Sequence, residues 1–481
     1  MTLLLRKLWP VVLTAVSVAL LAGCNDTLRQ FIIPVPKPAG DSQATAHAVV
    51  LSTNPSGGNG STLHIDVSGD TLAGIVDTGR DPVFLGKGPG RVYVINRNAA
   101  ANDTTTGNDT LTSYGSTSPL ATTPNTITMP STMPSAALNP IAGGVGASGD
   151  FFVANPTSNN LSQVAQFAQA VTNTITIPLG PPPTNPQGTP VAVAGNAAQA
   201  KIYVVNTVSG GPGYVTVIST TDNTVVKPSI PVGLNPIWAV MSNDGVFVFV
   251  VNQGDGTVMV IDTTLDIVLP CNGTLLTCPA PSSGAINVGL TPTGTPAATP
   301  AASPNFAFYD SKLQRLYVTN TGENSVAIIK ADGINSGTGV FPSLLKTVPV
   351  SGTPISVTAL SDGSKAYAAL GNCPAGTNHT NLVTPDTVTG KLASCNGAAV
   401  SVINATSLAE TNTITVGSGV VSVDSASDAS RVYAVSAHTG NVSIIKPSTD
   451  SVLATFPVPQ QNTACTSSCA LQVPFAVRVF P

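Results

Sequence analysis

The stretch RLYVTNTGENSVAIIKA, residues 315–331, reads as two β-strands joined by a short turn. The first strand carries an aromatic residue and branched residues and ends in Asn320. Gly and Asn between two runs of Val, Ile and aromatic residues are typical of antiparallel strand pairs. The first strand recurs as RVYVIN (91–96), DFFVAN (150–155), KIYVVN (201–206) and FVFVVN (247–252), with degraded copies KAYAAL (365–370) and RVYAVS (431–436).

Each copy has further strands on both sides. A short strand that opens near Pro precedes it, as in NPIWAVMSNDG (235–245), and a more exposed strand ends the repeat, as in NTVVKPSIPVG (223–233). Four strands per repeat, together with a spacing near that of a propeller blade, predict an all-β chain folded as a single β-propeller. A four-stranded sheet cannot bury both of its faces alone, so the blades stack in a ring.

Counting the repeats predicts eight blades. Seven remain the alternative, because the blade over about 81–130 has a weak pattern between Asn98 and Pro124. The segment AVVLST (48–53) lacks a leading strand of its own, and VPFAVRVF (473–480) looks like a leading strand without followers. We therefore expect these two segments to pair, which closes the ring and removes its exposed strand edges.

The YVTN-like strands, read beside strands such as IDTTLDIV (261–268), resemble the repeats of the YVTN-family β-propeller proteins of surface layers and cell envelopes. The resemblance covers about residues 47–481. It implies a propeller fold and an envelope setting. It implies no catalytic residue, because the shared motif is a strand that builds the blade.

The N-terminus predicts export. Arg6 and Lys7 precede an apolar run from Val11 to Leu21 that is too short to span a bilayer comfortably. The run ends in Leu-Ala-Gly-Cys, which resembles the lipobox of bacterial lipoproteins. The resemblance implies a signal peptide over 1–23, a lipidated Cys24 and a membrane anchor on the periplasmic side or outer surface of the envelope. An ordinary signal peptide with an incidental Cys is the alternative. Residues 24–46 would be an extended tether, and residues 47–481 the propeller.

Seven cysteines leave six once Cys24 is set aside. They fall into pairs that are close in sequence, and an exported protein meets an oxidising compartment. We expect disulfides between Cys271 and Cys278, Cys373 and Cys395, and Cys465 and Cys469. Metal ligation is the alternative, but the pairs lack CxxC spacing.

The strand-terminal asparagines are the most regular polar feature. An Asn side chain readily bonds nearby backbone and settles the turn that follows, which is the structural interpretation. The functional alternative is a ring of amides near the channel mouth that binds a glycan or peptide. The residues concerned are Asn96, Asn155, Asn206, Asn252 and Asn320.

Several function classes lack a signature. Only 9% of residues are charged, the formal net charge is −4, and no basic stripe exists for a nucleic-acid partner. No GxSxG or HExxH motif appears, no SxxK motif marks a nucleophile, and no GxGxxG opens a helix. The histidines His47, His64, His379 and His438 have no metal-ligand spacing, and the loop AANDTTTGNDT (100–110) does not match a calcium loop. We therefore expect no catalytic residue, cofactor or metal.

These features favour a non-catalytic envelope lipoprotein that presents the propeller as a binding or scaffold surface for an envelope protein or polysaccharide. The stapled insertion from Cys373 to Cys395 is the segment we expect to carry specificity, because loops on a regular scaffold usually do. The alternatives are a propeller enzyme, similar to lactone hydrolases or quinone-dependent dehydrogenases, and a structural surface-coat component. Fold alone does not choose between them.

Overall fold

The computed structural model describes residues 46–54, 58–97, 109–116, 124–129, 143–146, 148–195, 200–272, 284–290, 302–334, 339–373, 395–458 and 472–480. All of them belong to one compact unit, Thr45–Pro481. They contain strands and turns and no helix, so this part of the chain has no helical segment of membrane-spanning length.

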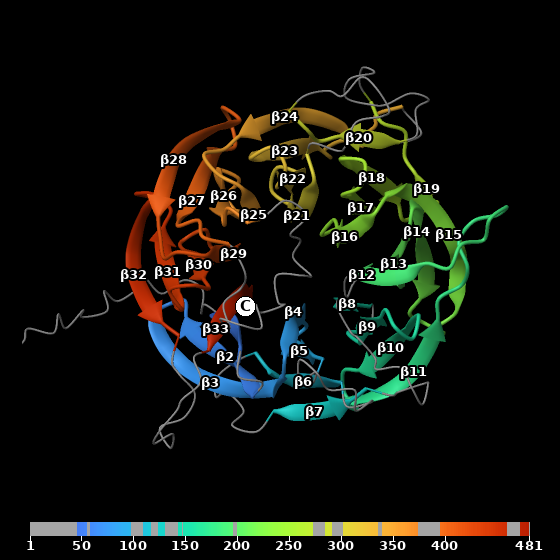
Figure 1. The fold of residues 1–481 in the computed structure, drawn as a ribbon, viewed down its shortest axis with the longest axis horizontal. Coiled ribbons are helices and arrows are strands. Elements are labelled where there is room, and N and C mark those ends of the chain that lie inside the picture. Colours follow the sequence, from blue (N-terminus) through green and yellow to red (C-terminus); the bar gives the residue numbers. More distant parts are fainter. Residues whose placement is uncertain are drawn as a thin grey trace, which may run out of the picture. The chain divides into compact units, whose positions relative to one another are not determined.

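Eight antiparallel sheets make up this unit, and we number them as blades 1–8 (Figure 1). Blade 1 joins the two ends of the chain. The strands of each blade are given in order from the axis outward. Blade 1 has β33 (Val473–Phe480), β1 (His47–Thr53), β2 (Asn59–Asp66) and β3 (Thr71–Arg80), and blade 2 has β4 (Pro82–Gly88), β5 (Arg91–Asn96), β6 (Thr110–Gly115) and β7 (Asn125–Thr128). Blade 3 has β8 (Gly143–Val145), β9 (Phe151–Asn155), β10 (Asn160–Ala165) and β11 (Ala170–Thr176), and blade 4 has β12 (Thr189–Ala194), β13 (Lys201–Val208), β14 (Gly211–Ser219) and β15 (Val225–Leu234).

The remaining blades follow the same order. Blade 5 differs in one respect, since two short segments, β19 and β20, share its outer position by pairing with β18. Blade 5 has β16 (Pro236–Met241), β17 (Phe247–Asn252), β18 (Thr257–Asp262), β19 (Ile267–Val268) and β20 (Ala285–Asn287), and blade 6 has β21 (Pro304–Asp310), β22 (Arg315–Asn320), β23 (Ser325–Lys330) and β24 (Ser343–Pro349). Blade 7 has β25 (Pro354–Ala359), β26 (Lys365–Leu370), β27 (Ala399–Asn404) and β28 (Ala409–Thr415), and blade 8 has β29 (Val420–Ser425), β30 (Val432–Ser436), β31 (Asn441–Lys446) and β32 (Ser451–Pro457).

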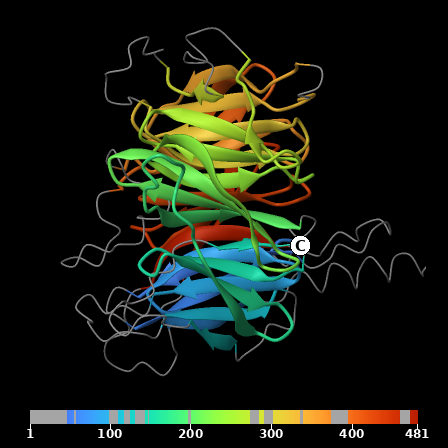
Figure 2. The ribbon, with the colours of Figure 1, turned by 90° about the vertical axis from the view of Figure 1, so that its right-hand side faces the viewer.

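The strand that closes the ring is the C-terminal segment predicted from the sequence. β33 runs antiparallel to β1, from His47 opposite Phe480 to Thr53 opposite Val473, and β29 of blade 8 packs against β33. The innermost strands of successive blades contact one another around the ring. Figure 1 shows the ring along its axis, and Figure 2 shows it from the side. The predictions of eight blades and of closure by the two chain ends are confirmed.

Burial explains why the middle strands read as continuous apolar runs. Every residue of β17 and β18 is buried, because neighbouring blades cover both faces of the sheet. The outer strands mix exposed and buried positions, as in β32. The largest fully buried side chains are aromatic, and seven of them are tyrosines of the second and third strands: Tyr93, Tyr114, Tyr203, Tyr214, Tyr317, Tyr367 and Tyr433.

Ion pairs hold successive blades together at one end of the ring. Lys201 at the start of β13 reaches Asp266 in the outer turn of blade 5, with 2.7 Å between Nζ and Oδ2. Lys365 of blade 7 makes the same contact with Asp450 of blade 8, also at 2.7 Å. A tyrosine two residues after each lysine donates to the same carboxylate. Hydrogen bonds to a charged group contribute about 1.5–3 kcal/mol each, so these contacts fix the blade spacing.

The same contact crosses the seam between blades 8 and 1. Arg431 donates from Nε and Nη2 to both oxygens of Asp70, at 3.0 and 2.7 Å. Asp70, Asp266 and Asp450 all have positive φ angles near 50°, in the turn between third and outer strands. Asp tolerates this left-handed conformation better than most residues, so one side chain serves both the turn and the ion pair.

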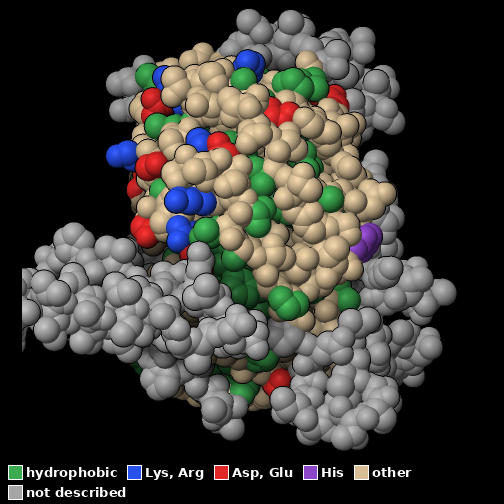
Figure 3. All heavy atoms as spheres, turned by 90° about the vertical axis from the view of Figure 1, so that its left-hand side faces the viewer, with side chains coloured by type: hydrophobic (Ala, Val, Ile, Leu, Met, Phe, Trp, Pro, Cys, Tyr) green, Lys and Arg blue, Asp and Glu red, His purple; other side chains and the backbone are tan. Residues whose placement is uncertain are grey.

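Charged side chains gather at this end of the propeller, which we call the charged end. It is the end where the first strand of each blade turns into the second and the third turns into the fourth, and Figure 3 shows Lys, Arg, Asp and Glu concentrated toward one side of the visible surface. Its acidic residues include Asp70, Asp244, Asp266, Asp310, Asp362, Asp428 and Asp450. The low overall charge is therefore distributed unevenly.

Candidate functional site

The five strand-terminal asparagines lie inside the blades. None has any exposed surface, and all stand at or near the end of a second strand, one strand away from the axis. Each Nδ2 donates to a hydroxyl oxygen on the third strand of its own blade. The distances are 3.0 Å from Asn96 to Thr112, 3.0 Å from Asn155 to Ser162, 3.1 Å from Asn206 to Thr216, 3.1 Å from Asn252 to Thr257 and 3.0 Å from Asn320 to Ser325. They join the second strand to the third, and other residues line the channel.

One of the three expected disulfides lies within the described residues. Cys373 and Cys395 are bonded, and both are buried beside blade 7. The loop that they close, 374–394, lies outside the described residues, as do Cys24, Cys278, Cys465 and Cys469. Cys271 is half-buried in the apolar cluster between blades 5 and 6.

Two histidines form a buried polar cluster between blades 1 and 2. His64 Nε2 lies 2.9 Å from the Tyr114 hydroxyl, which also bonds Thr62, and the rings of His47 and His64 meet edge to face at 5.8 Å. Burial, together with the nearby His47, lowers the pKa of His64 to about 3. The cluster is closed off by protein, so it is a packing feature.

A buried carboxyl group lies near this interface. Asp109 is the only acidic residue of the loop 100–110 that the structure describes; Asn102, Asp103 and Asn108 lie outside the described residues. Burial raises the pKa of Asp109 to about 7, against the opposing charge of Arg97, which is itself paired with Asp81 at 2.8 Å.

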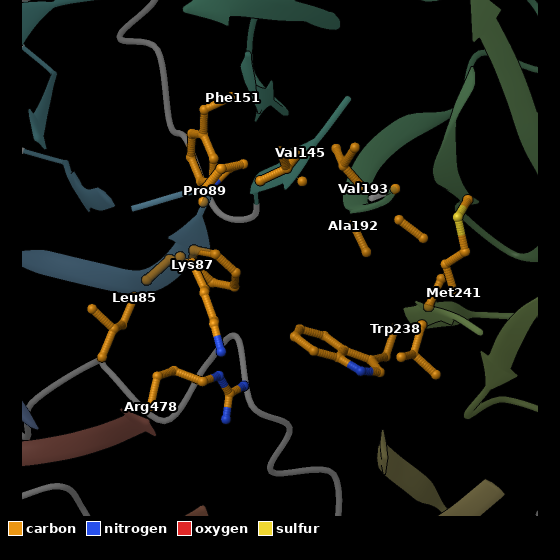
Figure 4. Close-up of a pocket in the computed structure, with 18 of the residues that line it drawn as sticks. Leu85, Lys87, Pro89, Val145, Phe151, Ala192, Val193, Trp238, Met241 and Arg478 are labelled. Carbon is orange, nitrogen blue, oxygen red and sulfur yellow. The ribbon is translucent and has the colours of Figure 1, made fainter. Parts of the chain in front are cut away.

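Two cavities open along the axis of the propeller. Cavity A, of about 440 Å³, lies among β4, β8, β12, β16 and β33, and cavity B, of about 500 Å³, lies among β16, β21, β25, β29 and β33. Cavity B reaches the turns after the innermost strands, at residues such as Asn243 and Ser361, so it opens at the charged end. Lys87, Trp238 and Arg478 line both cavities and form the border between them (Figure 4).

Two cations meet at this border. Lys87 stands near the end of β4 and Arg478 near the end of β33, on neighbouring innermost strands, and Figure 4 shows their charged groups side by side. The Arg478 guanidinium carbon lies 5.8 Å from the centre of the Phe306 ring of β21, and Trp238 packs against Phe306 at 5.1 Å. The arginine therefore extends from blade 1 toward aromatic side chains of blades 5 and 6.

Neither cation has an ion-pair partner within 4.0 Å among the residues that the structure describes. Lys87 Nζ donates to the carbonyl oxygen of Val479 at 3.1 Å. The surrounding protein lowers the pKa of Lys87; the carboxylate of Asp424 opposes this shift, and Arg478 adds to it. Asp424 is itself engaged, since its two oxygens accept the backbone N–H groups of Ser425 and Val479 at 3.0 and 2.9 Å.

The sequence analysis missed these residues, although a signal existed. Innermost strands are apolar or small in character, and only four of the eight carry a charged residue: Lys87, Asp310, Asp424 and Arg478. All four line cavity B. A charge placed in a leading strand of a propeller faces the axis or an adjoining blade, so scanning those strands for charge would have found the site.

No protein-family model and no curated protein sequence matches the chain. Its fold is similar to solved structures of low sequence identity. Dihydro-heme d1 dehydrogenase NirN in complex with DHE has a TM-score of 0.57 and 12% identity, covering 92% of this chain and 76% of that chain. AztD from Citrobacter koseri has a TM-score of 0.54 and 9% sequence identity, and the match covers 91% of this chain and 98% of that chain. The periplasmic gluconolactonase PpgL of Pseudomonas aeruginosa has a TM-score of 0.49 and 14% sequence identity, and the match covers 91% of this chain and 99% of that chain. The likenesses to NirN and AztD show the β-propeller fold.

Proposed function

We propose that this protein is an exported, lipid-anchored binding protein of the bacterial cell envelope, and that its propeller binds a ligand in the axial cavities. The observation that carries the proposal is the cation pair of Lys87 and Arg478, which faces two cavities of ligand size beside the half-buried Trp238. Pockets of about 300–1,000 Å³ with apolar walls and a few convergent polar groups are the usual form of ligand sites.

The anchor rests on the N-terminal motif. The run Leu21-Ala22-Gly23-Cys24 resembles a lipobox, and the repeat strands resemble those of YVTN-family envelope proteins. Cys24→Ser should move the protein from the membrane fraction to the soluble fraction of the envelope, because the thiol that receives the lipid is gone. A serine variant that stays with the membrane would refute a lipid anchor at this residue.

The binding activity is tested on the full-length protein extracted from its own membranes. Native mass spectrometry should show a bound mass that disappears on denaturation and is then identified in the extract. Cross-linking in intact cells covers the alternative that the ligand is the end of an envelope polymer or a segment of a protein. A protein that carries no small molecule and cross-links to no partner would contradict the proposal.

An enzyme remains the second candidate because of cavity B. Asp310 and Asp424 both line it, and burial raises the pKa of Asp310. One oxygen of Asp310 accepts the backbone N–H groups of Lys312 and Leu313, and the other has no partner. Lactone hydrolysis that is lost in both Asp310→Asn and Asp424→Asn would favour this candidate over a binding protein.

A further inference from the structure

We infer that the ligand of cavity A is an apolar organic monocarboxylate, whose carboxylate is held by Lys87 and Arg478 and whose body lies against Trp238. This inference rests on the proposed function and names the chemical class of the ligand. It follows from the composition of the cavity wall, the charge at its border and the shape of the surrounding surface.

The wall of cavity A is apolar apart from its border. Lys87 and Arg478 are the only charged side chains among its lining residues, and the indole of Trp238 is the only other side chain with a polar atom. The rest are Gly, Ala, Val, Leu, Met, Phe and Pro. A sugar or a peptide backbone would lose hydrogen bonds to water in such a cavity and find few replacements, which costs free energy for each unpaired group. An apolar body avoids this cost.

The border sets the charge of the ligand. Two neighbouring cations in a partly desolvated channel repel each other, and a bound anion between them removes that cost. Asp424 balances part of the charge, and it approaches from the side of cavity B. The net positive charge is therefore close to one, which suits a monoanion better than a phosphate dianion. Arg478 also offers the planar pair of donors that matches a carboxylate.

The flat aromatic surface favours an extended or planar body. Trp238 is half-buried, and Figure 4 shows its ring lying along the cavity opposite Lys87. Phe151 and Met241 line the same cavity from blades 3 and 5. A hydrocarbon chain or an aromatic ring fills such a slot, and its burial contributes about 25 cal/mol for each Å² removed from water.

The chain contains a built-in reporter for this test. Its two tryptophans are Trp9, within the predicted signal peptide, and Trp238. Once residues 1–23 have been removed, as the proposed signal peptide requires, Trp238 is the single tryptophan, and its fluorescence in the mature protein reports on cavity A. The probes are 4-phenylbutyrate, its uncharged amide 4-phenylbutyramide, and phenyl phosphate, titrated at low and high NaCl.

We expect 4-phenylbutyrate to bind at least about tenfold more tightly than the amide and than phenyl phosphate, because it alone satisfies the cation pair as a monoanion. Arg478→Gln and Lys87→Gln should each weaken the carboxylate about tenfold or more and leave the affinity for the amide unchanged. Lys446→Gln, at an exposed position at the end of β31, is the matched control and should bind as the wild type does. Raising the NaCl concentration should weaken the binding of the two anions, 4-phenylbutyrate and phenyl phosphate, and leave the affinity for the amide unchanged.

Two results would overturn the inference in different ways. If the acid and the amide bind equally, or if a neutral compound is recovered from the native protein, the carboxylate assignment is wrong while the proposed function stands. If no probe changes Trp238 fluorescence and no ligand is recovered, both fail. Because Arg478 lies on the closing strand, its variant is first checked for an unchanged melting temperature, and Lys87→Gln, on β4, decides the case if Arg478→Gln unfolds.

Discussion

The buried groups His64 and Asp109 give opposite pH dependences to the stability of the propeller. Burial lowers the pKa of His64 to about 3 from its usual 6.5, and burial raises the pKa of Asp109 to about 7 from its usual 3.8. As the pH falls below 6.5, His64 stays neutral in the folded protein, whereas the same side chain binds a proton in the unfolded chain. Asp109 behaves in the reverse way, since the folded protein keeps a proton that the unfolded chain releases.

The signs and magnitudes follow from linkage. The contribution of neutral His64 to the unfolding free energy is complete above pH 6.5 and is lost as the pH falls toward 3. The loss over the whole range amounts to about 5 kcal/mol. The contribution of Asp109 is complete below pH 3.8 and is lost as the pH rises toward 7, which amounts to about 4 kcal/mol. Between about pH 4 and 6.5 the two slopes, each about 1.4 kcal/mol per pH unit, cancel.

Substituting His64 or Asp109 alone reveals how the unfolding free energy depends on the pH through the other residue. With His64→Gln, the unfolding free energy relative to the wild type should rise as the pH falls from 6.5 to 4, because only Asp109 still responds. With Asp109→Asn it should fall over the same range. Urea unfolding at half-unit pH steps measures both, and the double variant should vary with pH as the wild type does. If the difference between each single variant and the wild type is the same at every pH, the assignment of these shifts to burial is refuted.

Three further predictions concern the ring. Deleting residues 472–481 removes the innermost strand of blade 1 and should abolish the cooperative thermal transition, whereas a truncated chain that melts no earlier than the intact one would contradict closure by β33. Phe480→Ala, at a side chain with no exposed surface, should lower the unfolding free energy by about 3–5 kcal/mol in urea titrations. Asp450→Ala leaves the Lys365 ammonium and the Tyr367 hydroxyl without their shared acceptor and should cost about 1.5–3 kcal/mol, and Tyr367→Phe should cost less; equal stability of Asp450→Ala and wild type would refute the blade-spacing role of this contact.

The fold could be predicted because blade formation is repeated and local. Each copy carries its own apolar pattern, so strands such as RLYVTN are identified independently, and the unmatched ends of the chain show where the ring closes. The ion pairs between blades were not predicted, although Lys201 and Lys365 occupy the same place in their repeats. Their partners lie about 65 and 85 residues away, and repeat alignment compares equivalent positions rather than positions in adjoining blades.

The candidate site was harder to predict for a physical reason. Regularity drew attention to the strand-terminal asparagines, and the structure uses them within five of the blades, where each joins the second strand to the third. A binding site on the axis of a propeller is asymmetric, because each blade supplies different side chains to it. Lys87 and Arg478 are therefore departures from the repeat, nearly 400 residues apart in sequence, and only the closed ring brings them together.

Arg478 links the ligand site to the integrity of the ring. β33 supplies both the pairing with β1 that closes blade 1 and one of the two cations that border cavity A. A ligand that binds only the closed ring stabilises it by mass action, by about 2.7 kcal/mol when present at 100 times its dissociation constant. 4-Phenylbutyrate at that concentration should therefore restore much of the stability that Phe480→Ala removes. In Phe480→Ala combined with Lys87→Gln, whose affinity is about tenfold lower, the same concentration should restore only about half as much. Equal rescue of both variants would mean that the carboxylate acts outside cavity A.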